Sequence, residues 1–187
     1  MIELLLADLE RQYHFAGLPE RRPTLWGLMA HLMSPRFLPV VLYRISHALY
    51  RRNLVAPARL FSFMNYALFG IEIAMRCEIG PGLYFPHTVG TVIGAQRIGR
   101  NAVIYHGVTI GAKEMDVRYR PDERPTVGDN VTIGSGAKVL GGIVIGSNAI
   151  VGANAVVTRT VPSGAVVGGV PARVLRHRTK RASGQPE

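Results

Sequence analysis

A histidine stands within a stretch of sequence whose neighbouring positions are mostly small or apolar. His87 lies between Pro86 and Thr88 in "YFPHTVGTVIG", residues 84–94. A hydroxyl group is a poor nucleophile until its proton is taken, and an imidazole can take that proton near neutral pH. His87 is therefore a candidate general base for group transfer to a hydroxyl. A plain surface histidine at a corner of the fold is the alternative.

A second histidine repeats the setting of the first. His106 lies nineteen residues after His87, and each follows a large apolar residue, Phe85 or Ile104, by two positions. The surrounding sequence has a six-residue period, so three units would form a coil of eighteen residues, with one residue inserted between the histidines. Both side chains should therefore stand in one column at one edge of the fold. Contact with a substrate and simple stacking both remain open for His106.

The element that must position these histidines is a repeat. Branched or large apolar residues recur at every sixth position, with a one-residue slip before Val92 and a break before Val127. The series comprises Ile73, Ile79, Phe85, Val92, Ile98, Ile104, Ile110, Val127, Ile133, Val139, Ile145, Val151 and Val157. Glycine and Asn between them suit tight corners, and smaller residues four positions on would fit a narrow core. This hexapeptide repeat predicts a mainly β fold, a parallel β-helix.

Two other parts of the chain depart from this period. The break at 112–126, "AKEMDVRYRPDERPT", is polar and charged, which predicts an extended loop that is either functional or merely a solvated insertion. Residues 1–70 instead carry apolar residues at helical spacing, as in "LPVVLYRISHALYRRN". Ser34 and Pro35 are expected to begin one helix, and Gly70 to end another.

We therefore expect a helical region at 1–70, a β-helix at 71–172 and a basic tail at 173–187. The formal net charge of +10 favours anionic partners. Because the basic residues form no stripe with interleaved aromatics, nucleic acid is the weakest candidate. The helices at 23–70 could lie on an anionic membrane surface or pack on the first coils and on neighbouring subunits.

Other features bear on location. No run of about 18 apolar residues and no signal peptide is evident, so a cytoplasmic protein is expected, with the inner face of the membrane as an alternative. Cys77 is the single cysteine, which fits a reducing compartment and excludes an internal disulfide. Its place in the repeat points inward, which predicts a buried thiol. Only His87 and His106 lie on the coils, whereas a histidine metal site needs three ligands, so we expect no metal.

Three strings together indicate a family. They are "GIEIAMRCEIGPGLYFPHTVGTVIG", "IYHGVTIGA" and "GSGAKVLGGIVIGSNAIVGANAVVTRTVPSGAVVGGVPARV". They resemble the serine acetyltransferase branch of the left-handed β-helix acyltransferases, and also the sister colanic-acid type acetyltransferases of exopolysaccharide pathways. The resemblance implies a homotrimer with active sites between neighbouring subunits. It also implies acetyl-CoA along the coils as acetyl donor and direct transfer to a hydroxyl.

The resemblance assigns catalytic roles. His87 corresponds to the family's general base, and Glu72 occupies the place of the carboxylate, an Asp in serine acetyltransferases, that orients it. A carboxylate on one ring nitrogen would fix the tautomer and stabilise the imidazolium. His106, where serine acetyltransferases usually carry a neutral residue, could contact the thioester or the acceptor. A backbone N–H at a glycine-rich corner would hold the oxyanion.

The resemblance also bears on the two substrates. Serine acetyltransferases carry Arg-His-Pro at the end of the loop, whereas this chain has Glu123, Arg124 and Pro125. Arg124 could still bind a carboxylate, but the altered charges favour a saccharide acceptor in exopolysaccharide biosynthesis, with L-serine as the alternative. The family pattern places backbone groups near Gly111, Ser135 and Ala153 beside CoA, and Lys138 and Arg173 are further candidates that could meet its phosphates.

Overall fold

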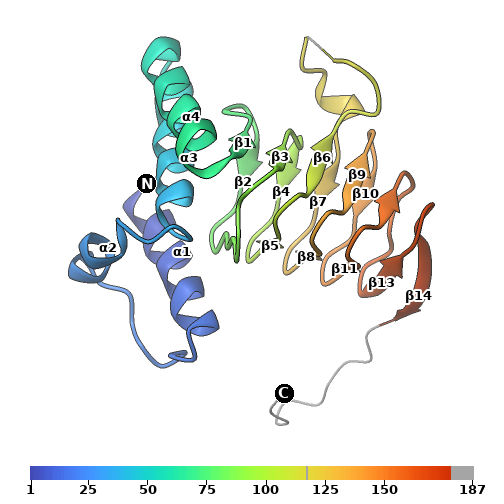
Figure 1. Cartoon of the computed structure of the whole chain (residues 1–187), viewed down its shortest axis with the longest axis horizontal. Coiled ribbons are helices and arrows are strands. Elements are labelled where there is room, and N and C mark those ends of the chain that lie inside the picture. The colour runs from blue at the N-terminus through green and yellow to red at the C-terminus, as the bar shows by residue number, and fades with distance from the viewer. Residues whose placement is uncertain (117, 178–187) are drawn as a thin grey trace.

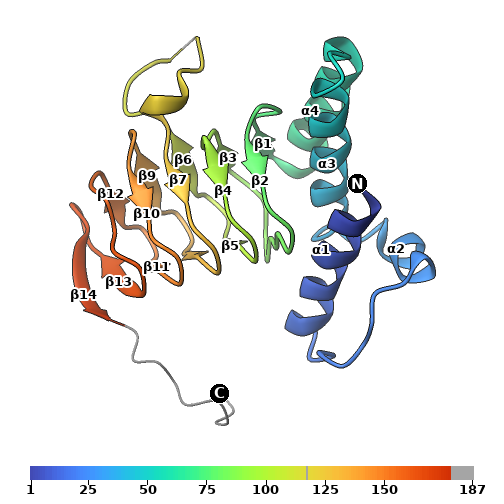
Figure 2. The ribbon, with the colours of Figure 1, turned by 180° about the vertical axis from the view of Figure 1, so that it is seen from behind.

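In the computed structural model, which describes residues 1–116 and 118–177, a helical region leads into a parallel β-helix (Figure 1). The helices stand at one end of the stacked coils, and the last strands lie at the other end. Figure 2 shows the same order from behind. None of the described residues belongs to a helix that is long and apolar enough to cross a membrane.

The helical region contains α1 (Ile2–Phe15), α2 (Leu25–His31), α3 (Leu38–Tyr50) and α4 (Val55–Phe69). Gly70 ends α4 with a φ of 60°, the left-handed conformation that glycine adopts at little cost. The predicted start of α3 at Ser34 and Pro35 is wrong. The carbonyl of Ser34 accepts hydrogen bonds from the backbone N–H groups of Phe37 and Leu38, so residues 34–37 form a turn that precedes the helix.

The chain then winds through three sheets in turn. Sheet A has the order β1 (Ile71–Ile73), β3 (Thr91–Ile93), β6 (Thr109–Gly111), β9 (Lys138–Leu140) and β12 (Val156–Val157). Sheet B has the order β10 (Val144–Ile145), β7 (Thr126–Val127), β4 (Arg97–Ile98) and β2 (Glu78–Ile79). Sheet C has the order β14 (Arg173–His177), β13 (Ala165–Gly168), β11 (Ile150–Val151), β8 (Thr132–Ile133) and β5 (Val103–Ile104).

We name the bends between sheets the A/B, B/C and C/A corners, in the direction of the chain. All strand pairs are parallel except β13 and β14, which are antiparallel and close the end of the solenoid. The first five residues of the predicted basic tail therefore form strand β14, and residues 178–187 lie outside the described residues.

The repeat positions fill the core as predicted, with one exception. Every residue of the series but Val92 is buried, and they join one hydrophobic cluster. Val92 is 40% exposed, whereas Ile93 is 1% exposed. The strand pairing explains the difference, because Ile93 is in register with Ile73 on one side and with Ile110 on the other. The inward position of β3 is therefore Ile93, one residue later than the period predicts. The corner before β3 is longer by one residue, and the unit that leads on to Ile98 is shorter by one.

A buried ion pair joins the helices to the first coil. Arg44 on α3 donates from Nε and Nη2 to Asp8 on α1, at 2.9 and 3.0 Å. The Asp8 carboxylate also accepts from the backbone N–H groups of Gly82 and Leu83, at 2.9 and 2.8 Å. Both charged side chains are almost fully buried. Asp8 and Arg44 therefore fix two helices against one B/C corner.

Cys77 lies inside the solenoid, as predicted, and should resist chemical modification. Its side chain is fully buried, and this burial raises the pKa of the thiol to about 12. Because only the thiolate reacts, we expect alkylation by iodoacetamide at mildly alkaline pH to be at least about 100-fold slower in the native protein than in the urea-unfolded chain. Mass spectrometry over time measures both rates. Equal rates would show that the thiol is accessible.

Candidate functional site

The two histidines meet at the C/A corner. Tyr84 and Val103 form a parallel bridge in register, so the chain leaves sheet C at equivalent places in two successive coils. The imidazole rings of His87 and His106 lie edge to face, with centroids 5.7 Å apart. Both side chains are exposed. The two imidazoles thus stand in one column, as their spacing in the sequence predicts, and solvent or a substrate can reach both.

Hydrogen bonds and close backbone packing hold this corner in place. Thr88, next to His87, donates from its hydroxyl to the carbonyl of Phe69 at the end of α4, at 3.0 Å. Gly90 donates to the carbonyl of Gly70 at 2.9 Å. The Cβ that a side chain at Gly107 would carry would lie 3.5 Å from Gly136 in the next coil. The helical region and the stacked glycines therefore fix the position of the His87 segment.

Glu72 does not contact His87 in the described structure. It is exposed on β1, and its neighbour in register on sheet A is Val92 of β3. The two described residues share neither a hydrogen bond nor an ion pair within 4.0 Å. The family pattern predicts a carboxylate that orients the imidazole, and this role of Glu72 stays a prediction.

Two of the residues expected near CoA continue the histidine column, and a third reaches it from strand β9. The backbone N–H of Gly136 donates to the carbonyl of His106, and that of Asn154 donates to the carbonyl of Ser135, so Ser135 stacks below His106. Ala153 occupies the same corner one coil further and is exposed. Lys138 on β9 donates from Nζ to the carbonyl of Gly107 at 2.6 Å.

The other two residues expected near CoA lie elsewhere. Gly111 ends β6 at the A/B corner, where an added Cβ would meet no atom within 4 Å. Arg173 begins β14 at the far end of the solenoid and is exposed. The open space at Gly111 suits the close approach of a ligand, whereas the position of Arg173 gives it no contact with the histidine column.

The loop between β6 and β7 stands out from the coils (Figure 1). Arg124 at its end is turned into the chain: it donates to the Asp116 carboxylate from Nε at 3.1 Å and to the Gly94 carbonyl from Nη1 at 2.9 Å. Its guanidinium lies 3.7 Å from the ring centroid of Tyr119, whose hydroxyl donates to the Ala95 carbonyl. Arg124 therefore anchors the loop at the A/B corner, and substrate binding by Arg124 stays a prediction.

Sequence reasoning missed the residues that hold this loop. Asp116 and Tyr119 contact Arg124 from within the loop, and Tyr119 adopts a φ of 56°, which is uncommon for a side chain of this size. No periodicity marks such residues, although an Asp and an Arg eight positions apart in one loop are compatible with an ion pair. Among the described residues, no group of three or more His, Cys, Asp or Glu could hold a metal ion.

The chain is similar to known transferases. Residues 124–159 match the family profile "Bacterial transferase hexapeptide (six repeats)". The serine acetyltransferase of Helicobacter pylori strain J99 is 39% identical over 145 residues, which are 77% of this chain and 83% of the relative. That of Synechocystis sp. is 38% identical over 187 residues, 98% of this chain and 71% of the relative. That of Synechococcus elongatus is 41% identical over 152 residues, and the chain spans only 60% of its length.

Solved structures that are similar to this chain are serine acetyltransferases as well. The serine acetyltransferase of Neisseria gonorrhoeae superposes with a TM-score of 0.80 at 34% identity, covering 95% of this chain and 67% of that one. A serine acetyltransferase in complex with CoA gives a TM-score of 0.80 at 32% identity, covering 93% and 69%. The predicted left-handed parallel β-helix with N-terminal helices is confirmed.

Proposed function

Since the chain belongs to the serine acetyltransferase family of hexapeptide-repeat enzymes, we propose that it transfers an acetyl group from acetyl-CoA to the hydroxyl of L-serine. The observation that carries this proposal is the exposed pair of imidazoles, His87 and His106, at a corner whose column continues through Ser135 and Ala153. The column offers a base beside a strip of small side chains, along which an extended donor could lie.

The acceptor differs from the one that the loop sequence favours. All the relatives and solved structures named above are serine acetyltransferases, and none of them supports a saccharide acceptor or a role in exopolysaccharide biosynthesis. The changed charges at 123–124 are what disfavours serine in the sequence. Arg124 already forms an ion pair with Asp116, a hydrogen bond with the Gly94 carbonyl and a cation–π contact with Tyr119. Because these contacts within the chain occupy its guanidinium, the presence of an arginine at this position says little about which acceptor binds.

In this proposal His87 accepts the proton of the serine hydroxyl as the oxygen attacks the thioester carbonyl carbon. The tetrahedral oxyanion would be held by a backbone N–H of the glycine-rich corner. When the carbon–sulfur bond breaks, the imidazolium returns the proton to the CoA sulfur. His106 lies close enough to His87 to contact either the thioester or the acceptor. Glu72 could orient His87 only after a movement of one of the two side chains.

A neighbouring copy of the chain is part of the proposal. The histidines lie at the C/A corner and the loop with Arg124 at the A/B corner, which are opposite edges of sheet A. A site that uses both would draw them from two subunits, which supports the expected homotrimer. A cytoplasmic location fits the lone buried cysteine.

The test is CoA release from acetyl-CoA by the purified protein, with L-serine and, separately, with sugars and nucleotide sugars. We expect turnover with serine. Turnover with a sugar alone would contradict the proposed acceptor, and no turnover with any acceptor would contradict the proposed reaction.

We call the small side chains of Ser135 and Ala153 the donor strip, because acetyl-CoA, the acetyl donor, is proposed to lie along them. A bulky side chain on this strip tests the proposal. Ala153→Trp should raise the KM for acetyl-CoA at least about 10-fold without lowering the Tm, because Ala153 is exposed at the C/A corner. Thr158→Trp is the matched control, since Thr158 is exposed at the A/B corner of the same coil. Equal KM values for both variants would remove Ala153 from the donor site.

A further inference from the structure

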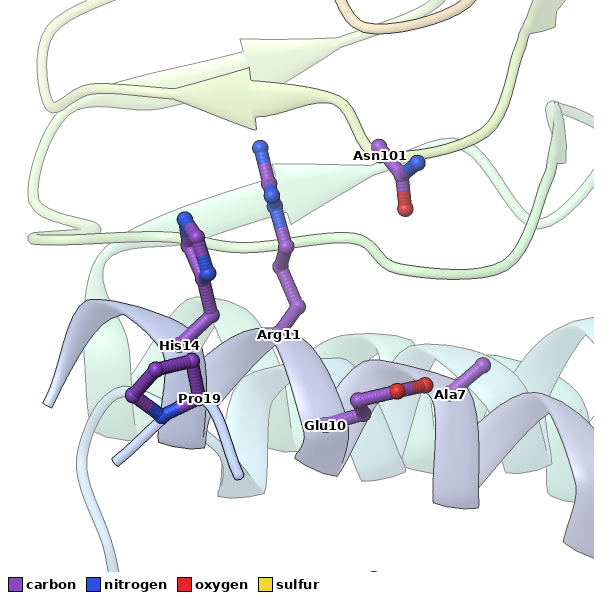
Figure 3. A pocket seen from close by; sticks show the side chains of 6 residues that line it. All are labelled: Ala7, Glu10, Arg11, His14, Pro19 and Asn101. Atoms are coloured by element: carbon purple, nitrogen blue, oxygen red, sulfur yellow. The ribbon is translucent and has the colours of Figure 1, made fainter. Parts of the chain in front are cut away.

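A cavity of about 260 Å³ lies where α1 passes the B/C corner of the second coil. The residues that line it are Ala7, Glu10, Arg11, His14, Pro19 and Asn101 (Figure 3). Four of them share one face of α1, and Asn101 comes from the solenoid. The cavity is at a different corner from His87 and His106, so the proposed acetyl transfer makes no use of it.

Arg11 is the charged group that this cavity leaves uncompensated. Its Nε atom is buried and has no hydrogen-bond partner among the described residues. Burial lowers the pKa of the guanidinium, and no carboxylate of the described chain offsets that effect. Arg44 on α3 shows the contrast, because Asp8 neutralises it with two hydrogen bonds. An arginine keeps its charge even when partly buried, so Arg11 is short of an anion.

The Arg11 side chain is held in position for such a ligand. Its guanidinium carbon lies 4.7 Å from the ring centroid of Phe15. Phe15 in turn stacks on Tyr84 of the solenoid, with centroids 4.4 Å apart and ring planes at 15°. Because the side chain is supported from one side, little conformational entropy would be lost when an anion binds.

Two further polar side chains line the same space. Figure 3 shows the Arg11 side chain reaching toward the solenoid, with His14 beside it and the Asn101 amide across the cavity. Asn101 donates one amide hydrogen to Asn130, at 3.0 Å, and Figure 3 shows its amide oxygen on the side of α1, where it can accept from a protonated phosphate oxygen. The Glu10 carboxylate lies along the helix, away from the guanidinium in this view, and forms no ion pair with Arg11 in the described structure.

From this cluster we propose that the cavity binds a small oxyanion of the phosphate class, either inorganic phosphate or the phosphate group of a small metabolite. The donors of Arg11 and His14, with an acceptor at Asn101, suit a phosphate that still carries a proton, and an arginine fork pairs well with phosphate. The volume is below that of most drug-sized sites, so the ligand must be compact. The bound anion would link α1 to the second coil, one coil beyond the contact that Asp8 makes.

The test uses the full chain and measures binding and stability. Isothermal titration with sodium phosphate at constant ionic strength gives the Kd, and a hundred-fold excess over that Kd should raise the Tm by about 5–10 °C. Sodium chloride is the ionic-strength control, malonate tests a carboxylate, and glycerol phosphate separates a metabolite from the free ion. Tighter binding of malonate than of either phosphate, or no binding of phosphate at about 20 mM, would overturn the proposal.

Variants make the test specific. Arg11→Met keeps an apolar stem over Phe15 and should lose the response to phosphate, whereas Arg59→Met, at an exposed site on α4, should keep it. Asn101→Asp places a carboxylate opposite Arg11 and should abolish the response. Asp tolerates the φ of 57° found there, so this variant should still fold. An unchanged phosphate response in both cavity variants would show that the anion binds elsewhere. Neither readout depends on acetyl transfer, so the proposed activity can fail independently.

Discussion

Replacing His87 by alanine should lower the kcat of acetyl transfer to serine by about 10²- to 10⁴-fold, which is the usual contribution of a positioned general base. The KM for acetyl-CoA should change little, because the donor strip at Ser135 and Ala153 stays intact. The Tm should also stay within about 2 °C of the wild type, since the His87 side chain is exposed. Initial rates of CoA release at saturating substrates, together with thermal denaturation, measure all three.

His106 supplies the matched control for that experiment. It lies in the same column, 5.7 Å from His87 between ring centroids, and is also exposed. We expect His106→Ala to cost less than about 10-fold in kcat, with a larger effect on a KM if it contacts a substrate. A large loss of kcat in His106→Ala, together with nearly full activity in His87→Ala, would show that His106 and not His87 is the general base. Full activity in both single variants would rule out base catalysis by this pair.

The sequence predicts the coils well because the residues that recur at the six-residue period are those whose side chains point into the core. At Val92 the period fails, since Val92 and Ile93 are both branched and apolar and either could occupy the inward position. Only the pairing of β3 with β1 and β6 decides which of them is buried. A corner that gains or loses a residue changes this register without altering the composition of the segment.

The helical region shows another limit of local signals. Ser34 and Pro35 have the residue types of a helix start, yet α3 begins at Leu38 after a turn. That turn places Phe37 in a small core with Leu9 of α1, a contact between segments far apart in the sequence. Tertiary packing therefore decides the helix boundary, as it often does against weak local preferences.

The candidate site also has one part that the sequence predicts and one part that depends on tertiary contacts. The column of His87 and His106 follows from the repeat, because equal positions in successive coils must stack. The partners of Arg124 do not follow from any repeat, since the loop leaves the period and returns with its own contacts to Asp116 and Gly94. Residue types in that loop suggested a saccharide acceptor, whereas the relatives support serine. A loop's charges inform on a substrate only when their internal partners are known.

The largest effect on stability is expected from Arg44→Met. The variant leaves the Asp8 carboxylate in a buried site with two backbone donors and without its cation. Removing one partner of a buried ion pair typically costs about 3–5 kcal/mol. At about 2–4 °C per kcal/mol for a chain of this size, the Tm should fall by about 6–20 °C. Thermal denaturation followed by circular dichroism measures the change.

The loss should depend on pH in a definite direction. Burial raises the pKa of the Asp8 carboxyl, and hydrogen bonds and the charge of Arg44 oppose that rise. Without Arg44 the native carboxyl should hold its proton to a higher pH than the unfolded chain does. A group that binds its proton more tightly in the native state stabilises the fold as the pH falls. The difference in Tm between wild type and Arg44→Met should therefore narrow from neutral pH toward about pH 4.

Two control variants distinguish the loss of a buried ion pair from the effect on Tm of removing any arginine charge. Arg100→Met removes one partner of the exposed pair with Asp129, whose side chains are 67% and 46% exposed, and should shift the Tm by no more than about 2 °C. The double variant Asp8→Leu with Arg44→Met removes both buried charges and should regain part of the lost stability. The two backbone donors of Gly82 and Leu83 would then lack an acceptor, so the recovery should be incomplete. If Arg44→Met and Arg100→Met lower the Tm equally, the buried pair does not fix α1 and α3 to the first coil.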